Sequence, residues 1–392
     1  DVIFGRAKGL RASLMRVFLR CLSWIFRGLV SLRLNLFKRG WKKQAHLGTM
    51  VISIGNITVG GTGKTPVVEL FARTLRDRGR KVSILSRGYK SKPLDEPQEW
   101  RKKDTGELIL GKYMPKVVSS GKGVELEVQY AGDEPYMLAK NLDNVSVVVD
   151  KDRVKGGKFA IQELEADILL LDDGMQFLKI AHSIDIVLVD SNSPFGTGAM
   201  MPRGTLREPP RNLCRADYIF ITKCRHPNNK KLIRKIRKYN KVAEIIECTH
   251  GPVHLENVFT GEIKSLSFLK DKYIAAISGI AVPESFEEKL TDLGANVLFH
   301  RTFSDHYSFS QDDIDRFMKR CMRRDADIIV TTEKDAVRFP QPTELDVEVY
   351  FLRIEVDILS GAEVWEKLVS RTCGERPPID PLLIYERPRK FT

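Results

Sequence analysis

The stretch Val51–Pro66 decides how this chain folds, and it reads Val-Ile-Ser-Ile-Gly-Asn-Ile-Thr-Val-Gly-Gly-Thr-Gly-Lys-Thr-Pro. Its first four residues, Val51–Ile54, are apolar and predict a buried strand, and from Val67 apolar residues recur at helical spacing. Between them lies a glycine-rich loop that ends in Lys64 and Thr65. Strand, glycine-rich loop, Lys-Thr and helix are the layout of a phosphate-binding P-loop. The stretch therefore predicts a site for a nucleoside triphosphate.

The chemistry of such a loop explains its composition. Glycines let successive backbone N–H groups turn toward an anion, and the helix N-terminus adds partial positive charge. Lys64 would reach the β- and γ-phosphates, and the Thr65 hydroxyl would bind Mg²⁺. The usual pattern starts with Gly six positions before the Lys, whereas this chain has Thr58; the alternative is a simple glycine-rich turn. The expected nucleotide-binding residues are Thr58, Val59, Gly60, Gly61, Thr62, Gly63, Lys64 and Thr65.

Length and cysteine content limit the domain number and the cellular compartment that the sequence allows. A chain of 392 residues is long enough for two domains or one large one. Its six cysteines are scattered without a Cys-x-x-Cys pair, which predicts reduced thiols in a cytoplasmic setting. Cys248, His250 and His254 lie close together, but Gly251 and Pro252 interrupt any helix there, so zinc is not favoured.

The net charge of +13 is concentrated at the N-terminus. Residues 1–45 carry eleven Lys or Arg and one acid, Asp1, which leaves +3 for the remainder. A nucleic-acid enzyme more often carries its basic face on the folded body. We therefore expect no nucleic-acid partner.

Residues 11–43 predict an amphipathic helix. Polar residues recur at steps of three and four, and most of the other positions are Leu, Phe, Trp, Ile or Val. Uncharged runs are too short to span a bilayer, and arginines in the apolar region argue against a signal peptide. The pattern is typical of a helix lying in a membrane interface with anionic lipids. The alternative is a helix that packs on a domain with a solvated basic edge.

Short apolar runs alternate with helical segments along residues 50–225, which predicts an α/β fold with a doubly wound parallel sheet. After about residue 250 the alternation resumes and suggests a second, smaller α/β domain. We expect domains at 1–45 (amphipathic helix), 46–248 (P-loop domain), 249–372 (second domain) and 373–392 (tail). Segment 91–116 predicts a loop or small hairpin, 191–211 a mobile active-site loop and 223–241 a basic helix. The predicted strands are 51–54, 81–85, 146–149, 168–171, 184–189, 217–222, 273–277, 296–299 and 327–331.

Several acidic and basic residues are placed to do chemistry. Asp172 and Asp173 follow an apolar strand, as do the acids that hold Mg²⁺ beside a P-loop, although an Asp-Gly turn is the alternative. Asp133 stands at a predicted helix start, where the helix dipole favours its proton-accepting form; an ordinary N-cap is equally compatible. A lone His such as His306 is more often structural than catalytic, but it would tune such a base if the fold brought it near. Arginines of the 201–209 loop suit phosphate recognition, and a solvated loop is the alternative. Residues 332–335 only superficially match a guanine-reading element, because its Asn is absent; a role beside the nucleobase stays open.

Together these motifs make the chain similar to one family, the tetraacyldisaccharide 4′-kinases, which are the lipid A 4′-kinases of Gram-negative bacteria. The resemblance covers roughly residues 12–370 and includes a P-loop that lacks the first Gly. Each motif alone is weak, but their conjunction in this order is specific. The motifs lie at 55–66, 85–89 (Leu-Ser-Arg-Gly-Tyr), 132–135 (Gly-Asp-Glu-Pro), 172–176 (Asp-Asp-Gly-Met-Gln), 203–209 (Arg-Gly-Thr-Leu-Arg-Glu-Pro), 278–286, 303–309 and 332–335.

The resemblance implies transfer of the ATP γ-phosphoryl group to the 4′-hydroxyl of a tetraacylated disaccharide 1-phosphate, in a cleft between two α/β domains. It implies Asp133 as general base with His306 as its partner, and Asp172 and Asp173 as metal-organising acids. Lys64 and Thr65 would hold phosphates and Mg²⁺, and Arg207 and Glu208 would line the site. The expected location is the cytoplasmic face of the inner membrane, on its anionic lipids, with a monomer favoured.

Two other classes of protein share part of this pattern. A membrane-associated P-loop ATPase that positions other proteins would carry a Lys one residue before the Gly-Gly of its loop, where this chain has Val59. A nucleotide-gated membrane scaffold would keep the P-loop but would not need Asp133, Asp172, Asp173 and His306 together.

Overall fold

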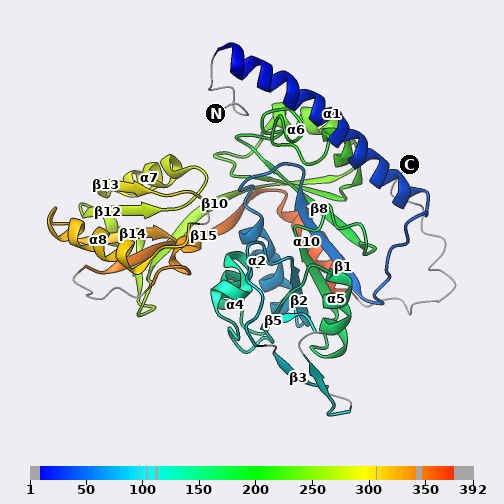
Figure 1. Cartoon of the computed structure of the whole chain (residues 1–392), viewed down its shortest axis with the longest axis horizontal. Helices are drawn as coiled ribbons and strands as arrows, with labels where there is room; N and C mark the ends of the chain where they lie inside the picture. Colours follow the sequence, from blue (N-terminus) through cyan, green and yellow to red (C-terminus); the bar gives the residue numbers. More distant parts are fainter. Residues whose placement is uncertain are drawn as a thin grey trace.

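One mixed β-sheet runs through the molecule and carries two lobes (Figure 1). The computed structural model describes residues 9–96, 98–102, 105–110, 114–305, 307–340 and 347–374. Along the sheet the strands follow the order β13-β12-β14-β15-β10-β9-β8-β1-β7-β2-β6-β5, and β11 pairs with β10. The predicted α/β class is confirmed, with the difference that a continuous sheet links the two lobes.

The P-loop lobe contains the predicted parallel strands. Six of them pair in parallel, and a short antiparallel strand, β5, closes the edge next to β6. Helices cover both faces, and the predicted basic helix forms as α6. The strands are β1 (Met50–Asn56), β2 (Val82–Ser86), β5 (Lys116–Ser119), β6 (Ser146–Val149), β7 (Ile168–Asp172), β8 (Ile184–Asp190) and β9 (Tyr218–Thr222). The helices are α2 (Lys64–Asp77), α3 (Val128–Ala131), α4 (Asp133–Asn141), α5 (Arg153–Gln162), α6 (Lys230–Arg237) and the 3₁₀ turn η1 (Pro210–Arg215).

Strand β7 shows why these short apolar runs fold as central strands. Its residues are buried on both faces: Ile168 and Leu170 enter one hydrophobic cluster, while Leu169 and Leu171 enter the other. Successive side chains of a strand point to opposite faces, so a strand covered on both sides needs an unbroken apolar run. Burial of each Leu contributes roughly 1.5–3 kcal/mol.

The second lobe repeats the pattern on a smaller scale. Its parallel strands confirm the three predicted after residue 250, and its helices fill two further hydrophobic clusters. The elements are β11 (Ile263–Ser265), η2 (Leu266–Leu269), β12 (Tyr273–Ser278), α7 (Pro283–Asp292), β13 (Asn296–Thr302), α8 (Gln311–Met322), β14 (Ile328–Thr332) and α9 (Glu333–Ala336).

Two long antiparallel strands, β10 (Glu244–Asn257) and β15 (Val349–Ser360), connect the lobes (Figure 1). Neither was among the predicted strands. A division at residues 248 and 249 cuts through β10. The last helix, α10 (Ala362–Cys373), returns to the P-loop lobe, where the ring of Trp365 lies 5.2 Å from that of Phe71. We therefore retain the two-lobe division as a proposal in which β10 and β15 are shared.

The polar 91–116 segment contains the hairpin β3 (Glu99–Arg101) and β4 (Leu108–Leu110). All six cysteines are free, as predicted. The predicted tail falls largely on residues 375–392, which lie outside the described residues.

Helix α1 (Leu10–Lys38) lies along the outside of the P-loop lobe (Figure 1). Ser23, a member of the predicted polar stripe, faces the body, where its hydroxyl donates to the Met200 carbonyl and accepts from the Arg203 N–H. The opposite side is apolar and exposed. A helix that served only to pack on the domain would not need an exposed apolar side. Within the described residues no helix has the length and hydropathy to span a membrane. The exposed apolar residues are Leu10, Leu14, Met15, Val17, Phe18, Trp24, Ile25, Leu29 and Leu32.

Candidate active site

The P-loop is fastened to the end of β1 by polar side chains. Asn56, which is fully buried, donates to the Thr62 hydroxyl over 3.0 Å and lies 3.5 Å from the Lys64 ammonium. Gly63 precedes α2 with φ +79°, a left-handed conformation that glycine adopts readily. The first residues of α2 are Lys64 and Thr65, so their side chains stand at the positive end of the helix dipole.

Other segments hold the loop from both sides. The Val59 N–H donates to the Thr205 carbonyl over 2.7 Å, and Thr58 bridges to Leu206. From β9, the Thr222 hydroxyl donates to the Thr62 carbonyl over 2.8 Å, and the next residue, Lys223, donates to the Gly61 carbonyl. The predicted loop 191–211 therefore lies against the P-loop.

The two acids after β7 differ in environment. Asp172 is buried, and desolvation together with the nearby Glu134 raises its pKa to about 6. Asp173 is half-buried; desolvation raises its pKa, but the nearby Lys64 and Arg207 outweigh this effect and lower the pKa. Its carboxylate lies 3.6 Å from the Lys64 ammonium and accepts from Arg207 over 2.6 Å. The P-loop lysine, the strand-end acids and an arginine of the 201–209 loop thus meet at one point.

Those acids have the donor set that Mg²⁺ requires. One carboxylate oxygen of Asp172 and one of Asp173 are buried without a hydrogen bond in the part of the chain that the structure describes. Carboxylate and hydroxyl oxygens are the protein ligands that Mg²⁺ prefers, with substrate phosphates completing the shell. The same described residues contain no cluster of three His, Cys, Asp or Glu side chains suited to a metal. The two acids therefore fit Mg²⁺ held jointly with a nucleotide.

Arg207 and Glu208 are neighbours that face different surroundings. Arg207 points to Asp173, as described above, whereas the Glu208 side chain is buried. The Glu208 carboxylate accepts from Gln176 at 3.0 Å, Asn212 at 2.7 Å and Arg215 at 3.1 Å. This geometry fits a residue that fixes the loop carrying Arg207.

Asp133 begins helix α4 and faces the second lobe. Its carboxylate lies 3.5 Å from the guanidinium of Arg338, which is also bonded to the buried Asp335 at 2.6 Å. Asp335 itself is anchored by the Gly279 N–H at 2.9 Å and the Thr332 hydroxyl at 2.6 Å. The structure thus brings Asp133 to the 332–335 motif. The predicted partner His306 lies outside the described residues, so its position stays a prediction.

Sequence reasoning missed residues that complete the site. Asn56 and Gln176 stood inside quoted motifs but had no predicted role; Gln176 donates to the Asn56 carbonyl over 3.0 Å. Arg153, buried in α5, donates to the Asp173 carbonyl over 3.0 Å. Arg338 had no signal except its place three residues after Asp335.

His250 of β10 was considered only as a metal ligand, yet its ring lies against Gly63, with Nε2 3.4 Å from the Gly63 carbonyl. Burial lowers the pKa of His250 from 6.5 to about 4. Between these pH values the unfolded chain binds a proton that the folded chain does not, so stability falls as the pH falls from 6.5 toward 4. We expect His250 to contribute about 1–3 kcal/mol to this loss.

The measurement is the urea midpoint as a function of pH for the wild type and for His250→Gln. The difference between the two proteins should change across pH 6.5 to 5. A difference that is constant over this range would show that the His250 ring protonates equally well in the folded protein.

Most of the chain is similar to one family of known proteins. The model of the family described as tetraacyldisaccharide-1-P 4′-kinase matches residues 15–373. A tetraacyldisaccharide 4′-kinase of Halothermothrix orenii is 35% identical over 358 residues, which is 87% of this chain and 88% of that protein. One of Anaeromyxobacter dehalogenans is 35% identical over 345 residues, with 87% and 86% covered. The crystal structure of LpxK from Aquifex aeolicus in complex with ATP matches with a TM-score of 0.70 and 28% identity, covering 92% of this chain and 100% of that one.

Proposed function

This chain belongs to the tetraacyldisaccharide 4′-kinase family, and from that premise we propose that it transfers the γ-phosphoryl group of ATP to the 4′-hydroxyl of a tetraacylated disaccharide 1-phosphate, giving lipid IVA. The observation that carries the proposal is the convergence of Lys64, Asp173 and Arg207 at the start of α2. Two cations and a carboxylate at a helix N-terminus suit a triphosphate whose terminal group is transferred.

On the nucleotide side, the backbone of residues 58–63 would surround the phosphates. The Lys64 ammonium would stabilise the negative charge that shifts from the γ-phosphoryl group to the leaving ADP during transfer. Arg207 would neutralise charge that develops on the transferred group, because its guanidinium is already aimed at this position by Asp173. Glu208 would act through Arg207, as a positioning residue. Thr65, Asp172 and Asp173 would hold Mg²⁺, which supplies charge neutralisation of the phosphates when bound.

On the acceptor side, Asp133 would take the proton of the 4′-hydroxyl. The oxygen of that hydroxyl would form a bond to the γ-phosphorus while the bond from the γ-phosphorus to the ADP oxygen breaks. The start of helix α4 favours the carboxylate form that this step requires. Arg338 would orient the Asp133 carboxylate from the second lobe. His306 would assist as its partner. One chain supplies all these groups, so a monomer suffices.

The acceptor carries four acyl chains, which leave a bilayer only at a large cost in free energy. We propose that the protein acts peripherally at the cytoplasmic face of the inner membrane, with the exposed apolar side of α1 in the interface. The support is the exposure of Phe18 (58%), Trp24 (67%) and Ile25 (61%) on one helix that is fixed to the lobe carrying the P-loop.

The deciding experiment is transfer of ³²P from γ-labelled Mg·ATP to tetraacyldisaccharide 1-phosphate in neutral detergent micelles. Labelled lipid is the expected product. Hydrolysis of ATP without labelled lipid would exclude the kinase and favour the membrane-associated P-loop ATPase.

Replacing Phe18 and Ile25 together by Glu is expected to weaken binding to lipid vesicles by roughly 100-fold, since two buried apolar side chains are lost from the interface. Nucleotide affinity should stay unchanged, because α1 lies outside the P-loop. The measurement is co-sedimentation with vesicles beside an ATP titration.

The matched control is Ile263→Glu with Tyr273→Glu, two exposed apolar residues of the second lobe. These changes add the same charge and should leave vesicle binding intact. Equal losses in both variants would show that α1 is not the membrane contact.

A further inference from the structure

The most basic segment outside the N-terminus has no role in the proposed reaction. From Tyr218 to Ala243 the sequence has nine Lys or Arg and no Asp or Glu. Helix α6 and the turn after it carry seven of these cations. Among the described residues, none of the seven lies within 4.0 Å of a carboxylate. The six that are exposed are Lys230, Lys231, Arg234, Lys235, Lys238 and Lys241. We call these six residues the α6 basic face.

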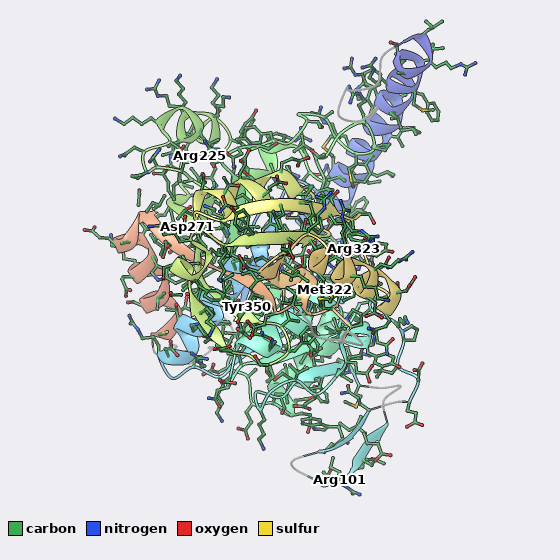
Figure 2. The ribbon with its side chains drawn as sticks, turned by 90° about the vertical axis from the view of Figure 1, so that its left-hand side faces the viewer. Arg101, Arg225, Asp271, Met322, Arg323 and Tyr350 are labelled. Atoms are coloured by element: carbon green, nitrogen blue, oxygen red, sulfur yellow. The ribbon has the colours of Figure 1, made fainter. Side chains whose placement is uncertain are left out.

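The packing of α6 sends this face outward, to the end of the molecule where α1 lies. Leu232 and Ile236 are buried in the cluster against which Phe26 of α1 also packs. The loop between the two helices touches both: the Phe195 ring lies 5.7 Å from that of Tyr239, and the Met200 carbonyl accepts from Ser23 of α1. Figure 1 places α6 at the same end of the molecule as α1, and Figure 2, turned by 90°, shows the two helices on different sides of that end, with the side chains of α6 extending from the top.

We propose that the α6 basic face is a second membrane contact, which docks on the phosphate groups of anionic lipids while the apolar side of α1 enters the interface. The inference rests on one part of the proposed function, namely that the acylated substrate lies in a membrane. It adds α6 to the N-terminal helix, on which the sequence pattern alone had placed the preference for anionic lipid.

Physical chemistry favours a lipid surface over other polyanions here. Exposed cations at the same end of the molecule as an exposed apolar helix fit a membrane, where phosphates lie above acyl chains. The α6 basic face also ends at Val242, an apolar residue that is 85% exposed. Each Lys or Arg held near an anionic surface strengthens binding by roughly fivefold, and the effect decays within a Debye length.

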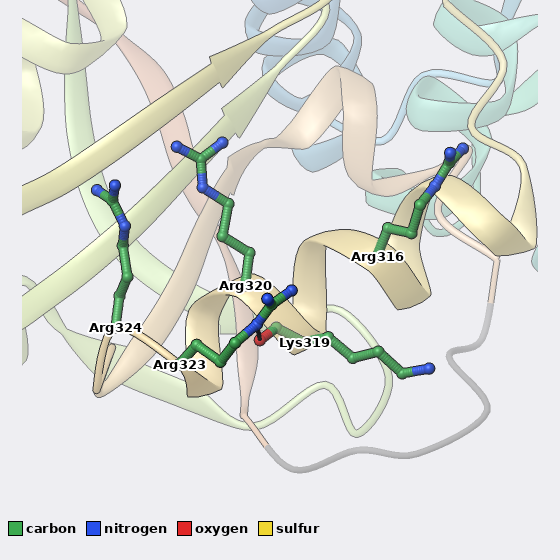
Figure 3. Close-up of a pocket in the computed structure, with 5 residues that line it drawn as sticks. All are labelled: Arg316, Lys319, Arg320, Arg323 and Arg324. Atoms are coloured by element: carbon green, nitrogen blue, oxygen red, sulfur yellow. Dashed lines mark hydrogen bonds between the residues drawn. The ribbon is translucent and has the colours of Figure 1, made fainter.

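A second basic cluster provides the matched control. Arg316, Lys319, Arg320, Arg323 and Arg324 of α8 and the residues just after it line an open hollow of about 480 Å³ (Figure 3). Arg320 and Arg324 lie over the ring of Phe299, at 4.4 and 5.2 Å from its centroid. Figure 1 places α8 in the other lobe, away from α1 and α6.

The test compares two full-length variants with equal net charge. The α6 variant is Lys231→Gln, Lys235→Gln and Lys238→Gln; the α8 variant is Lys319→Gln, Arg323→Gln and Arg324→Gln. Binding is measured by co-sedimentation with phosphatidylcholine vesicles, alone or mixed equally with phosphatidylglycerol, at low and high salt. The α6 variant should bind mixed vesicles roughly 100-fold more weakly at low salt and should show a smaller salt dependence than the wild type, because the cations of the N-terminal helix remain. The α8 variant should bind within about threefold of the wild type.

The remaining outcomes are equally informative. Unchanged binding of the α6 variant, or equal losses in both variants, would overturn the proposal. So would an α6-dependent affinity for duplex DNA that exceeds the affinity for mixed vesicles. Both variants should label lipid normally in neutral micelles, because neither touches the site. Failure of the wild type to label lipid would reject the kinase while leaving the vesicle result to stand on its own.

Discussion

Replacing Asp133 by Asn is expected to lower phosphoryl transfer by roughly 100- to 10,000-fold, the range that a general base contributes. Asn has the shape of Asp but cannot accept the proton of the acceptor hydroxyl. The first turn of α4 and the Arg338 contact at 3.5 Å should still hold the side chain in place. ATP affinity should change little, because the P-loop contacts belong to other residues. The measurement is single-turnover transfer of label beside an ATP titration.

The control is Asp143→Asn, an exposed acid just after the same helix. It removes the same charge and should leave transfer unchanged. If Asp133→Asn retained transfer within about threefold of the wild type, another group would have to accept the proton.

Replacing Arg353 by Met is expected to destabilise the protein by about 3–5 kcal/mol, the usual consequence of removing one partner of a buried ion pair. Arg353 of β15 is buried and contacts Glu69 of α2 and Glu333 of α9. Although burial opposes its charge, these two acids raise the pKa of Arg353 above its usual value. Burial also opposes the charge of Glu333, and it therefore raises the pKa of this carboxyl group. Without the arginine, two carboxylates would remain close together in a buried place.

The measurement is the urea midpoint followed by Trp365 fluorescence, since Trp365 packs on Phe71 of α2. Arg78→Met is the control, because the Arg78–Glu366 pair is exposed and should contribute no more than about 1 kcal/mol. Adding Glu69→Gln and Glu333→Gln to Arg353→Met should restore part of the stability. Equal midpoints for Arg353→Met and Arg78→Met would contradict the assignment.

The Arg353 cluster also describes how the lobes are joined. Asn141 of α4 donates to Glu333 over 2.6 Å and to Glu69 over 3.3 Å, and Arg73 of α2 pairs with Glu355 of β15 at 2.9 Å. The helix that begins with Lys64 and the helix that begins with Asp133 are thus bonded to one another and to β15. The predicted destabilisation should therefore be accompanied by a loss of transfer.

The sequence predicted most of the parallel sheet, because central strands such as β7 are short and uniformly apolar. It also predicted the P-loop and the acids after β7, since those residues are consecutive and their order carries the signal. Strands β10 and β15 were missed because they alternate charged, polar and apolar residues: β10 contains Gly251 and Pro252, and β15 contains Arg353 and Glu355. Such strands form because they pair with neighbouring strands, and β10 and β15 pair mainly with each other.

By itself, therefore, the sequence determined what is local: the P-loop, the buried strands, the amphipathic N-terminal helix and the family to which the chain is similar. Only the tertiary structure decided which distant residues meet. It placed Arg338 against Asp133, Arg207 against Asp173 and His250 against Gly63, and it turned the apolar side of α1 away from the body. Periodicity and motif spacing record contacts within one element, whereas these contacts depend on how elements far apart in the chain pack on a common sheet.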